Sequence, residues 1–207
     1  MPHRPHKSRR RTAIIAGLFV SAVAVAIAVG VYRRCCGTPK RFAVVQRGVL
    51  YRSAQPRTRQ IDHLIEKIHL RTDLIVRSGS SRHVPDEVAH ARSRGLNVIH
   101  IPIDSRKPIP DDQVQAFFRC VDNPVNRPVL IHCSAGRHRT GYLCALYRIE
   151  RQGWTKERAL EEMLSFGFDT QSQAEVLKQL RNYKPGRWKP AGTRIGAPKN
   201  RGTPTQP

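Results

Sequence analysis

A run of 20 residues without a charge, from Ala13 to Tyr32, limits the possible folds of this chain more than any other part of it. About 20 apolar residues in helical form match the hydrocarbon thickness of a bilayer, and a soluble domain rarely contains such a run. The run therefore predicts a transmembrane helix over residues 13–32. A basic N-terminal segment, residues 1–12, precedes this helix.

A cleaved secretory signal is the competing interpretation of this run. Basic residues precede it, and the small residues Ala24, Ala26 and Ala28 offer cleavage sites. The apolar stretch is long for a signal peptide, so we expect an uncleaved, single-pass membrane anchor. The alternative is a secreted or periplasmic protein after cleavage. Five Lys or Arg precede the run and five follow it by residue 47, so the side of the membrane stays open.

The positive charge of the chain is concentrated at its two ends. The formal net charge is +22, and residues 1–41 carry nine Lys or Arg without an acid, while residues 184–207 carry six without an acid. Neither end alternates aromatic residues with these cations, so we expect no nucleic-acid partner. Cations beside a membrane segment suit anionic lipid. We interpret residues 33–41 as a basic linker and the Pro/Gly-rich residues 185–207 as a disordered basic tail.

Between these ends, strand-like and helix-like segments alternate. Apolar, β-branched runs predict strands, and amphipathic patterns between them predict helices. The expected strands are 42–45, 70–76, 98–103 and 129–132, and the expected intervening helices are 59–68, 86–94 and 111–121. Three further helices are expected at 140–151, 156–166, with Thr155 as N-cap, and 171–183. This order predicts an α/β fold with a central, mostly parallel sheet flanked by helices.

The five cysteines show neither the CxxC spacing of a metal site nor the density of a disulfide scaffold. We therefore expect mostly free thiols. Cys120 and Cys144 lie in predicted helices, where a small buried thiol is the ordinary case. Cys133 differs, because it directly follows a predicted strand and starts a loop that leads into a helix.

This loop has the features of a phosphate-binding turn. Backbone N–H groups of a strand-to-helix loop converge on one point, and the helix dipole adds partial positive charge there. Gly136 permits a turn that a Cβ would hinder. Arg139 can close the loop with a planar fork of donors for two phosphate oxygens. The expected phosphate-binding residues are Ser134, Ala135, Gly136, Arg137, His138, Arg139 and Thr140.

The same positive surroundings favour the thiolate of Cys133 over its thiol, which makes Cys133 a candidate nucleophile at neutral pH. Hydrolysis through a phosphocysteine would follow, with Thr140 donating to the sulfur as it leaves. We expect His132 to orient the loop through backbone contacts.

At this point the chain resembles the protein tyrosine and dual-specificity phosphatase superfamily, whose signature is HCxxGxxR followed by Ser or Thr. It is most similar to the atypical dual-specificity phosphatases of plants and fungi and their bacterial relatives. The similar segments are Leu50-Tyr51-Arg52-Ser53-Ala54-Gln55-Pro56, Ile109-Pro110-Asp111-Asp112, Arg127-Pro128-Val129-Leu130-Ile131-His132-Cys133 and Gly136-Arg137-His138-Arg139-Thr140-Gly141. The resemblance covers about residues 42–168 and implies a phosphatase domain, which we place at residues 42–184.

The superfamily places an acidic residue on a loop upstream of the cysteine, where it protonates the leaving group. Asp104 follows a predicted strand and is the first candidate. Asp111 and Asp112 are rivals, although acids in the first turn of a helix also complement its dipole. The third alternative is that no protein acid acts, since an acidic leaving group such as a phosphoanhydride needs less help from one.

The expected substrates are phosphomonoesters of the phosphotyrosine and phosphoserine/threonine type. Arg137 and His138 would favour phosphoinositides or inositol phosphates and pyrophosphates if they face the site, whereas both could instead pack the loop from behind. Arg52 and Arg77 follow strand-like segments and lie either near the mouth or on the surface. A non-catalytic phosphate-binding module is the alternative of another class, although the loop keeps both Cys133 and Arg139. No cofactor or metal is expected.

Overall fold

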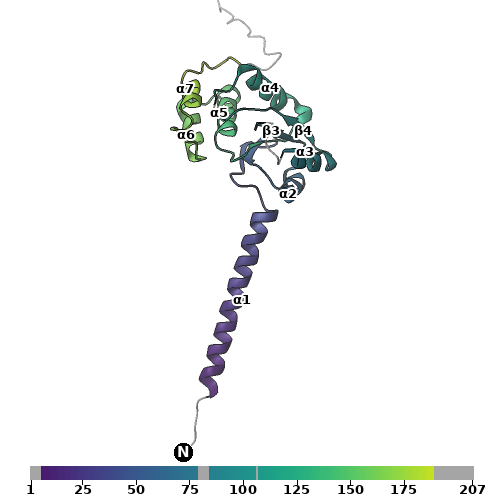
Figure 1. Ribbon diagram of the computed structural model, residues 1–207, viewed down its shortest axis with the longest axis vertical. Helices are drawn as coiled ribbons and strands as arrows, with labels where there is room; N and C mark the ends of the chain where they lie inside the picture. Colours follow the sequence, from purple (N-terminus) through teal and green to yellow (C-terminus); the bar gives the residue numbers. More distant parts are fainter. Residues whose placement is uncertain (1–5, 79–83, 106, 189–207) are drawn as a thin grey trace, which may run out of the picture.

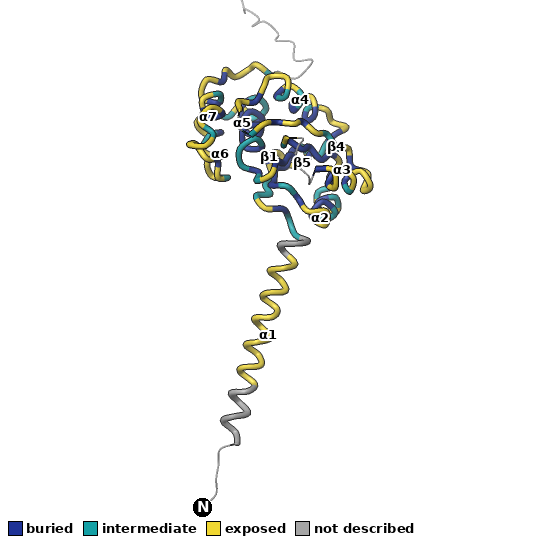
Figure 2. The backbone as a smooth tube through the Cα atoms, in the orientation of Figure 1, coloured by how far each residue is buried: buried dark blue, intermediate teal, exposed yellow. Residues whose placement is uncertain are grey.

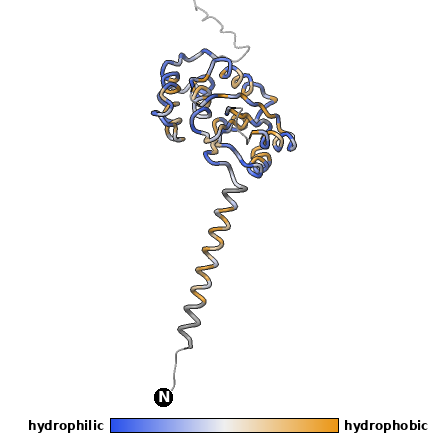
Figure 3. Tube along the Cα trace, in the orientation of Figure 1, coloured by the Kyte–Doolittle hydropathy of each residue, from blue (hydrophilic) through white to orange (hydrophobic). Residues whose placement is uncertain are grey.

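The computed structural model describes residues 6–78, 84–105 and 107–188. Helix α1 (His6–Cys36) is long and lies outside the folded domain (Figure 1). Within it, Ile14–Tyr32 is long and apolar enough to cross a membrane, and the side chains there are exposed (Figure 2). Figure 3 shows the apolar character of this stretch. A helix that is apolar on all sides needs a lipid or protein environment.

Five strands form one sheet in the order β1-β2-β5-β3-β4. β1 pairs antiparallel with β2, and the other neighbours pair in parallel. The strands are β1 (Ala43–Gln46), β2 (Leu50–Ala54), β3 (Thr72–Ile75), β4 (Asn97–His100) and β5 (Val129–Cys133). The predicted α/β class with a mostly parallel sheet is confirmed, and β5 occupies the centre of that sheet.

Helices cover both faces of the sheet because successive residues of a strand point to opposite sides. On one face, Leu130 of β5 belongs to a buried cluster with residues of α2 (Thr58–Ile68) and α3 (Val84–Ser93). On the other face, Val129 and Ile131 belong to a larger cluster with residues from four helices. These helices are α4 (Asp111–Asp122), α5 (Arg139–Gln152), α6 (Lys156–Ser165) and α7 (Ala174–Arg181), and a short 3-10 helix spans Pro124–Asn126.

Each predicted strand and helix is present, with ends that differ by a few residues. Thr155 caps α6 as predicted, because its hydroxyl accepts the Arg158 N–H at 3.2 Å. The last helix starts later than predicted: the Asp169 carboxylate accepts the N–H groups of Gln171 and Ser172, which holds a turn there. β2 was not predicted as a strand, since two polar residues interrupt its apolar pattern, yet all five of its residues are buried.

The predicted disorder from residue 185 onward is wrong for residues 185–188, while 189–207 lie outside the described residues. The Trp188 ring stacks on Phe118, with centroids 6.2 Å apart, and its carbonyl accepts from Arg151 at 2.6 Å. Gly186 N–H donates to Glu150 at 2.8 Å. Trp188 thus gives residues 185–188 an apolar surface to bury, although Pro and Gly dominate the composition of the tail.

Candidate active site

The Cys133 loop lies at the carboxyl edge of the sheet, between the end of β5 and the start of α5. Both neighbouring strands run parallel to β5, so their ends reach the same edge. Ala54 at the end of β2 is in register with Cys133, and the next residue, Gln55, donates its N–H to the Ser134 carbonyl at 3.1 Å. On the other side, Val76 N–H donates to the His132 carbonyl at 2.8 Å. The loop is thus held from both sides.

Gly136 is required in this loop for two separate reasons. Its φ is +68°, a conformation that residues with a side chain rarely adopt. In addition, a Cβ on Gly136 would lie 2.5 Å from the Ser53 carbonyl oxygen and 2.6 Å from the Ala54 nitrogen. The conformational reason was predicted from the sequence, whereas the close approach to β2 is visible only in the structure.

Among the three cysteines whose side chains the structure describes, Cys133 is the one whose surroundings favour a thiolate. Its Sγ accepts the Gly136 N–H at 3.3 Å, and its residue is 2% exposed. Burial alone would raise the pKa of Cys133, but hydrogen bonds from the Thr140 side chain and N–H, the charge of Arg139 and the Gly136 N–H together lower it. Among the described residues no group satisfies the buried Thr140 Oγ1 with a regular hydrogen bond, so this hydroxyl is available to the sulfur.

The two other described thiols have the opposite character. Cys120 and Cys144 are buried, and burial raises the pKa of both, that of Cys144 to about 11. Neither forms a disulfide, as predicted. The contrast shows that the loop donors, rather than burial, distinguish Cys133. The side chains of Cys35 and Cys36 lie outside the described structure.

Arg139, which the sequence predicts to close the loop, contacts the segment after β4. Its Nη1 donates to the Ile103 carbonyl at 3.2 Å, while its buried Nε has no hydrogen-bond partner among the described residues. The guanidinium therefore keeps donors free for an anion in the loop. The charge of Arg139 also acts on the Cys133 thiolate.

The two other basic residues of the loop pack against the segment after α6. The His138 ring meets Phe168 edge-on, with centroids 5.5 Å apart, and a Cβ at Gly167 would lie 3.1 Å from Cδ of Arg137. Burial and the neighbouring Arg137 lower the pKa of His138, so it is largely neutral at pH 7. His138 thus follows the packing alternative rather than acting as a second loop cation. Ser134 and Ala135 offer carbonyls to Gln55 and Arg41.

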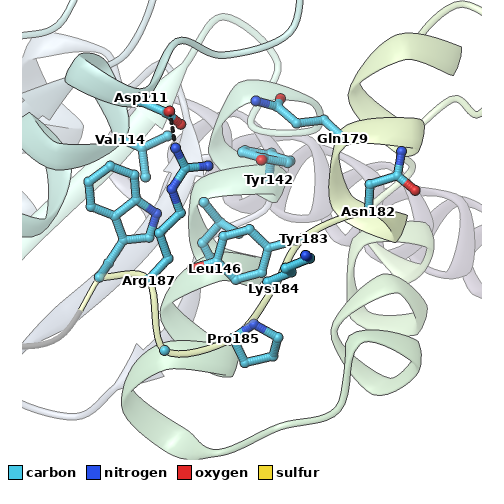
Figure 4. A pocket seen from close by; sticks show the side chains of 12 residues that line it. Asp111, Val114, Tyr142, Leu146, Gln179, Asn182, Tyr183, Lys184, Pro185 and Arg187 are labelled. Carbon is cyan, nitrogen blue, oxygen red and sulfur yellow. Dashed lines mark hydrogen bonds and ion pairs between the residues drawn. The ribbon is translucent and has the colours of Figure 1, made fainter.

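The three candidate acids have different surroundings. Asp104 is exposed and directly follows Ile103, whose carbonyl Arg139 holds. Asp111 pairs with Arg187, and it lines a separate cavity of about 590 Å³ together with Tyr142, Gln179 of α7 and residues that follow α7 (Figure 4). Asp112 is exposed in the first turn of α4. The structure thus connects Asp104 to the Cys133 loop through Arg139, and it gives Asp111 a structural partner.

A buried charge cluster that the sequence did not predict lies beneath the loop. His132 Nε2 lies 3.0 Å from Oδ1 of Asp73 and 3.2 Å from Oε1 of Glu87, and the His132 side chain is fully buried. Burial alone would lower the pKa of His132, but the two carboxylates raise it to about 9. Burial raises the pKa of Glu87 to about 7, despite the opposing effect of His132. The predicted backbone contact is also present, since Nδ1 of His132 lies 3.4 Å from the Cys133 carbonyl.

These three side chains are close enough to bind one metal ion, because their ligand atoms lie within 4.8 Å of one another. A histidine binds a metal ion only when its imidazole ring is neutral. Here a single ring nitrogen, Nε2 of His132, faces both carboxylates: it hydrogen-bonds Oδ1 of Asp73, and Oε1 of Glu87 lies at ion-pair distance. We therefore interpret the cluster as a protonated histidine paired with two acids that orients the start of the loop.

Arg52 was expected near the mouth or on the surface, and the structure places it in neither position. It is fully buried behind the loop, where its Nη2 donates to the Gly136 carbonyl at 3.0 Å. Its guanidinium carbon lies 3.8 Å from the centre of the Phe166 ring. Arg52 therefore supports the back of the loop with a hydrogen bond and a cation–π contact.

Residues 37–185 match the family described as the tyrosine phosphatase family. The dual specificity protein phosphatase TpbA of Pseudomonas aeruginosa is 33% identical over 120 residues, covering 58% of this chain and 51% of that protein. The inositol diphosphatase SIW14 of Saccharomyces cerevisiae is 29% identical over 139 residues, covering 63% and 46%. The crystal structure of the SIW14 catalytic core superposes with a TM-score of 0.63 at 26% identity, covering 71% of this chain and 87% of that one. The chain spans about half the length of these curated relatives.

Proposed function

Because this chain belongs to the tyrosine phosphatase family, we propose that it hydrolyses phosphomonoesters through a phosphocysteine on Cys133. The observation that carries the proposal is the environment of the Cys133 sulfur, where donors from Thr140 and Gly136 and the charge of Arg139 lower the pKa of a buried thiol. A thiolate beside a ring of anion-binding groups is the arrangement that nucleophilic attack on phosphate requires.

In the first step, the Cys133 thiolate attacks phosphorus in line with the leaving oxygen. The S–P bond forms as the P–O bond to the leaving group breaks, and the leaving oxygen takes a proton from a carboxylic acid, for which Asp104 is our candidate. Loop N–H groups and Arg139 stabilise the charge on the three transferred oxygens.

In the second step, water attacks the phosphocysteine. The S–P bond breaks, inorganic phosphate leaves, and the water proton returns to the carboxylate that acted as acid. The hydroxyl and N–H of Thr140 stabilise the departing thiolate. The net reaction consumes one water and yields an alcohol and phosphate, and it needs no metal because the thiolate and Arg139 supply the nucleophile and the charge stabilisation.

Two substrate classes are consistent with the relatives. TpbA is named a dual specificity protein phosphatase, which supports phosphotyrosine and phosphoserine/threonine in proteins. SIW14 and several plant relatives are named inositol diphosphatases, which supports inositol pyrophosphates as the second candidate. Our first candidate is the phosphoprotein, with the inositol phosphates and phosphoinositides as the alternative.

We also propose that α1 anchors the domain in a membrane, with secretion after cleavage as the alternative. The exposed apolar side chains around all of Ile14–Tyr32 support the anchor.

Arg41 lies five positions after Cys36, the end of α1, and its Nη1 donates to the Ala135 carbonyl of the loop at 3.2 Å. Five residues extend to at most about 18 Å, so the site would lie close to the membrane surface. Membrane fractionation with alkaline extraction tests this: an anchored chain stays in the pellet.

Hydrolysis by the purified full-length chain in EDTA tests the proposed activity. Wild type, Cys133→Ser and the control Cys120→Ala are compared on a phosphotyrosine peptide, a phosphoinositide and an inositol pyrophosphate. We expect Cys133→Ser to lose a factor on the order of 10⁴–10⁶ in turnover, while Cys120→Ala keeps most of it. Folded wild-type protein without turnover on any of the three would instead indicate a phosphate-binding module.

A further inference from the structure

Arg77 lies beside the Cys133 loop although it is distant from it in sequence. It follows Val76, whose N–H donates to the His132 carbonyl at 2.8 Å, directly before Cys133. β3 and β5 are parallel neighbours, so their carboxyl ends place Arg77 and the loop at the same edge of the sheet. Arg77 is half-buried, and its own carbonyl lies 2.8 Å from Nε2 of His100.

Gln55 fixes the position of Arg77 relative to the loop. Its backbone N–H donates to the Ser134 carbonyl at 3.1 Å. Its side-chain oxygen accepts a hydrogen bond from Arg77, and its side-chain nitrogen donates to Oε2 of Glu87 at 3.0 Å. Glu87 is itself held by Nε2 of His132. Arg77 is thus ordered by a chain of contacts that begins in the charge cluster beneath the loop.

The charge of Arg77 is not neutralised by a direct ion pair. Across residues 6–78, 84–105 and 107–188, Arg77 forms no salt bridge with a carboxylate, and Gln55 stands between it and Glu87. Burial lowers the pKa of Arg77, and the nearby charge of Arg139 lowers it further, while Glu87 and Cys133 oppose this effect. Two guanidinium groups therefore act on the same small region, beside a single thiolate.

We propose that Arg77 binds a second phosphate group of the substrate, adjacent to the one that Cys133 attacks, and that Gln55 positions Arg77 for this contact. The inference rests on the proposed phosphatase function and favours the second of its two substrate classes: molecules with two neighbouring phosphates, either a diphosphate or vicinal phosphomonoesters. The loop and Arg139 bind the scissile phosphate, and a second anion beside it offsets the charge of Arg77.

Binding measurements on full-length Cys133→Ser separate the two phosphate sites, because this chain cannot turn substrate over. Calorimetry compares inorganic phosphate with pyrophosphate for this protein, with Arg77→Ala added, and with Arg119→Ala added as the control. Arg119 lies on α4, where its side chain bonds Gln115 on the exposed surface. We expect Arg77→Ala to weaken pyrophosphate binding about 10- to 100-fold and phosphate binding less than about threefold. Arg119→Ala should change neither.

Turnover then distinguishes the two kinds of doubly phosphorylated substrate. Wild type and Arg77→Ala are assayed with an aryl monophosphate, an inositol diphosphate and an inositol with vicinal monophosphates. We expect kcat/KM to fall about 10- to 100-fold for at least one doubly phosphorylated substrate and to change little for the aryl phosphate, with partial recovery in Arg77→Lys. Gln55→Ala should reproduce part of the same selective loss.

If Arg77→Ala lost equal affinity for phosphate and pyrophosphate, Arg77 would support the loop as a whole, and the inference would be overturned. If the variant lost affinity for neither anion, Arg77 would not bind phosphate, and the inference would be overturned as well. Failure of the proposed function has a different signature. If wild type hydrolyses none of the substrates while Arg77→Ala still selectively weakens pyrophosphate binding, the hydrolase assignment fails and the two-phosphate site remains.

Discussion

Arg139 Nη1 donates to the Ile103 carbonyl at 3.2 Å, so the arginine that opens α5 holds the residue before Asp104. The far end of the same segment is held by α7, because Gln179 donates to the Ile109 carbonyl at 2.7 Å and accepts its N–H at 3.0 Å. The segment between β4 and α4 is therefore held at Ile103 by the Cys133 loop and at Ile109 by α7. This arrangement favours Asp104 as the general acid.

Asp104→Asn should slow the hydrolysis of substrates with poor leaving groups by about 10²-fold or more, because the leaving oxygen then departs without a proton. An aryl phosphate with a strongly acidic phenol should lose far less. The measurement is kcat/KM for a series of aryl phosphates of increasing phenol pKa. Asp112→Asn serves as the control.

A leaving-group dependence that is the same in Asp104→Asn and wild type would remove Asp104 from the mechanism. If Asp112→Asn instead steepened the dependence, the acid would come from the start of α4.

Gly136→Ala should destabilise the loop and abolish phosphate binding. The new Cβ would meet the backbone of Ser53 and Ala54 at 2.5–2.6 Å, in a conformation already unfavourable for alanine. Gly153→Ala is a matched control, since Gly153 has a φ of +66° and open space around its Cβ position. Thermal unfolding should show a loss of about 1 kcal/mol for Gly153→Ala and a clearly larger loss for Gly136→Ala. Similar losses in the two variants would refute the close-approach explanation.

Cys133 should react with iodoacetate at a pH well below the ordinary thiol pKa, because its own pKa is lowered. Cys120 and Cys144 should stay unmodified in the folded protein, since burial raises their pKa values. Peptide mass spectrometry of protein alkylated between pH 5 and 9 measures the rate at each cysteine, and added phosphate should protect Cys133. A rate at Cys133 that rises only above pH 8 would contradict the thiolate assignment.

The charge cluster predicts how stability depends on pH. The folded pKa values of Glu87, about 7, and His132, about 9, exceed the ordinary values of 4.5 and 6.5, so folding takes up protons between these limits. Their contribution to stability is complete at low pH and is lost as pH rises through about 7 and then 9. Glu87→Gln removes one of the two groups and should flatten the decline between pH 5 and 7 by an amount on the order of 1–3 kcal/mol.

The control for this experiment is Glu161→Gln on the exposed surface of α6. Urea unfolding of wild type and both variants at several pH values gives the free energies. Identical pH profiles for wild type and Glu87→Gln would show that the cluster does not titrate as described.

The loop was predictable because its chemistry is local in sequence. Cys133, Gly136 and Arg139 stand at fixed spacing between an apolar strand and a helix, and that pattern alone indicates an anion site. The partners of His132 were not predictable, since Asp73 lies 59 residues away on β3 and Glu87 lies on α3. The parallel pairing of β3 with β5 brings Asp73 to His132, and α3 supplies Glu87.

Arg52 and Trp188 show two other limits of the sequence pattern. Arg52 was expected near the mouth of the site or on the surface. It is buried instead, because the Gly136 carbonyl and the Phe166 ring, from distant parts of the chain, stabilise its guanidinium. Trp188 lies in a segment whose composition predicts disorder, yet its ring stacks on that of Phe118. In both cases tertiary contacts override the local composition.

Acid quenching during turnover shows whether Cys133 carries a covalent phosphoryl group. Full-length protein is mixed with a labelled aryl phosphate, quenched at early times and mapped by peptide mass spectrometry. We predict one phosphoryl group on the peptide that contains Cys133, formed and consumed at rates that match turnover, and no label in Cys133→Ser. Steady turnover without any label on Cys133, or label on another residue, would contradict the account.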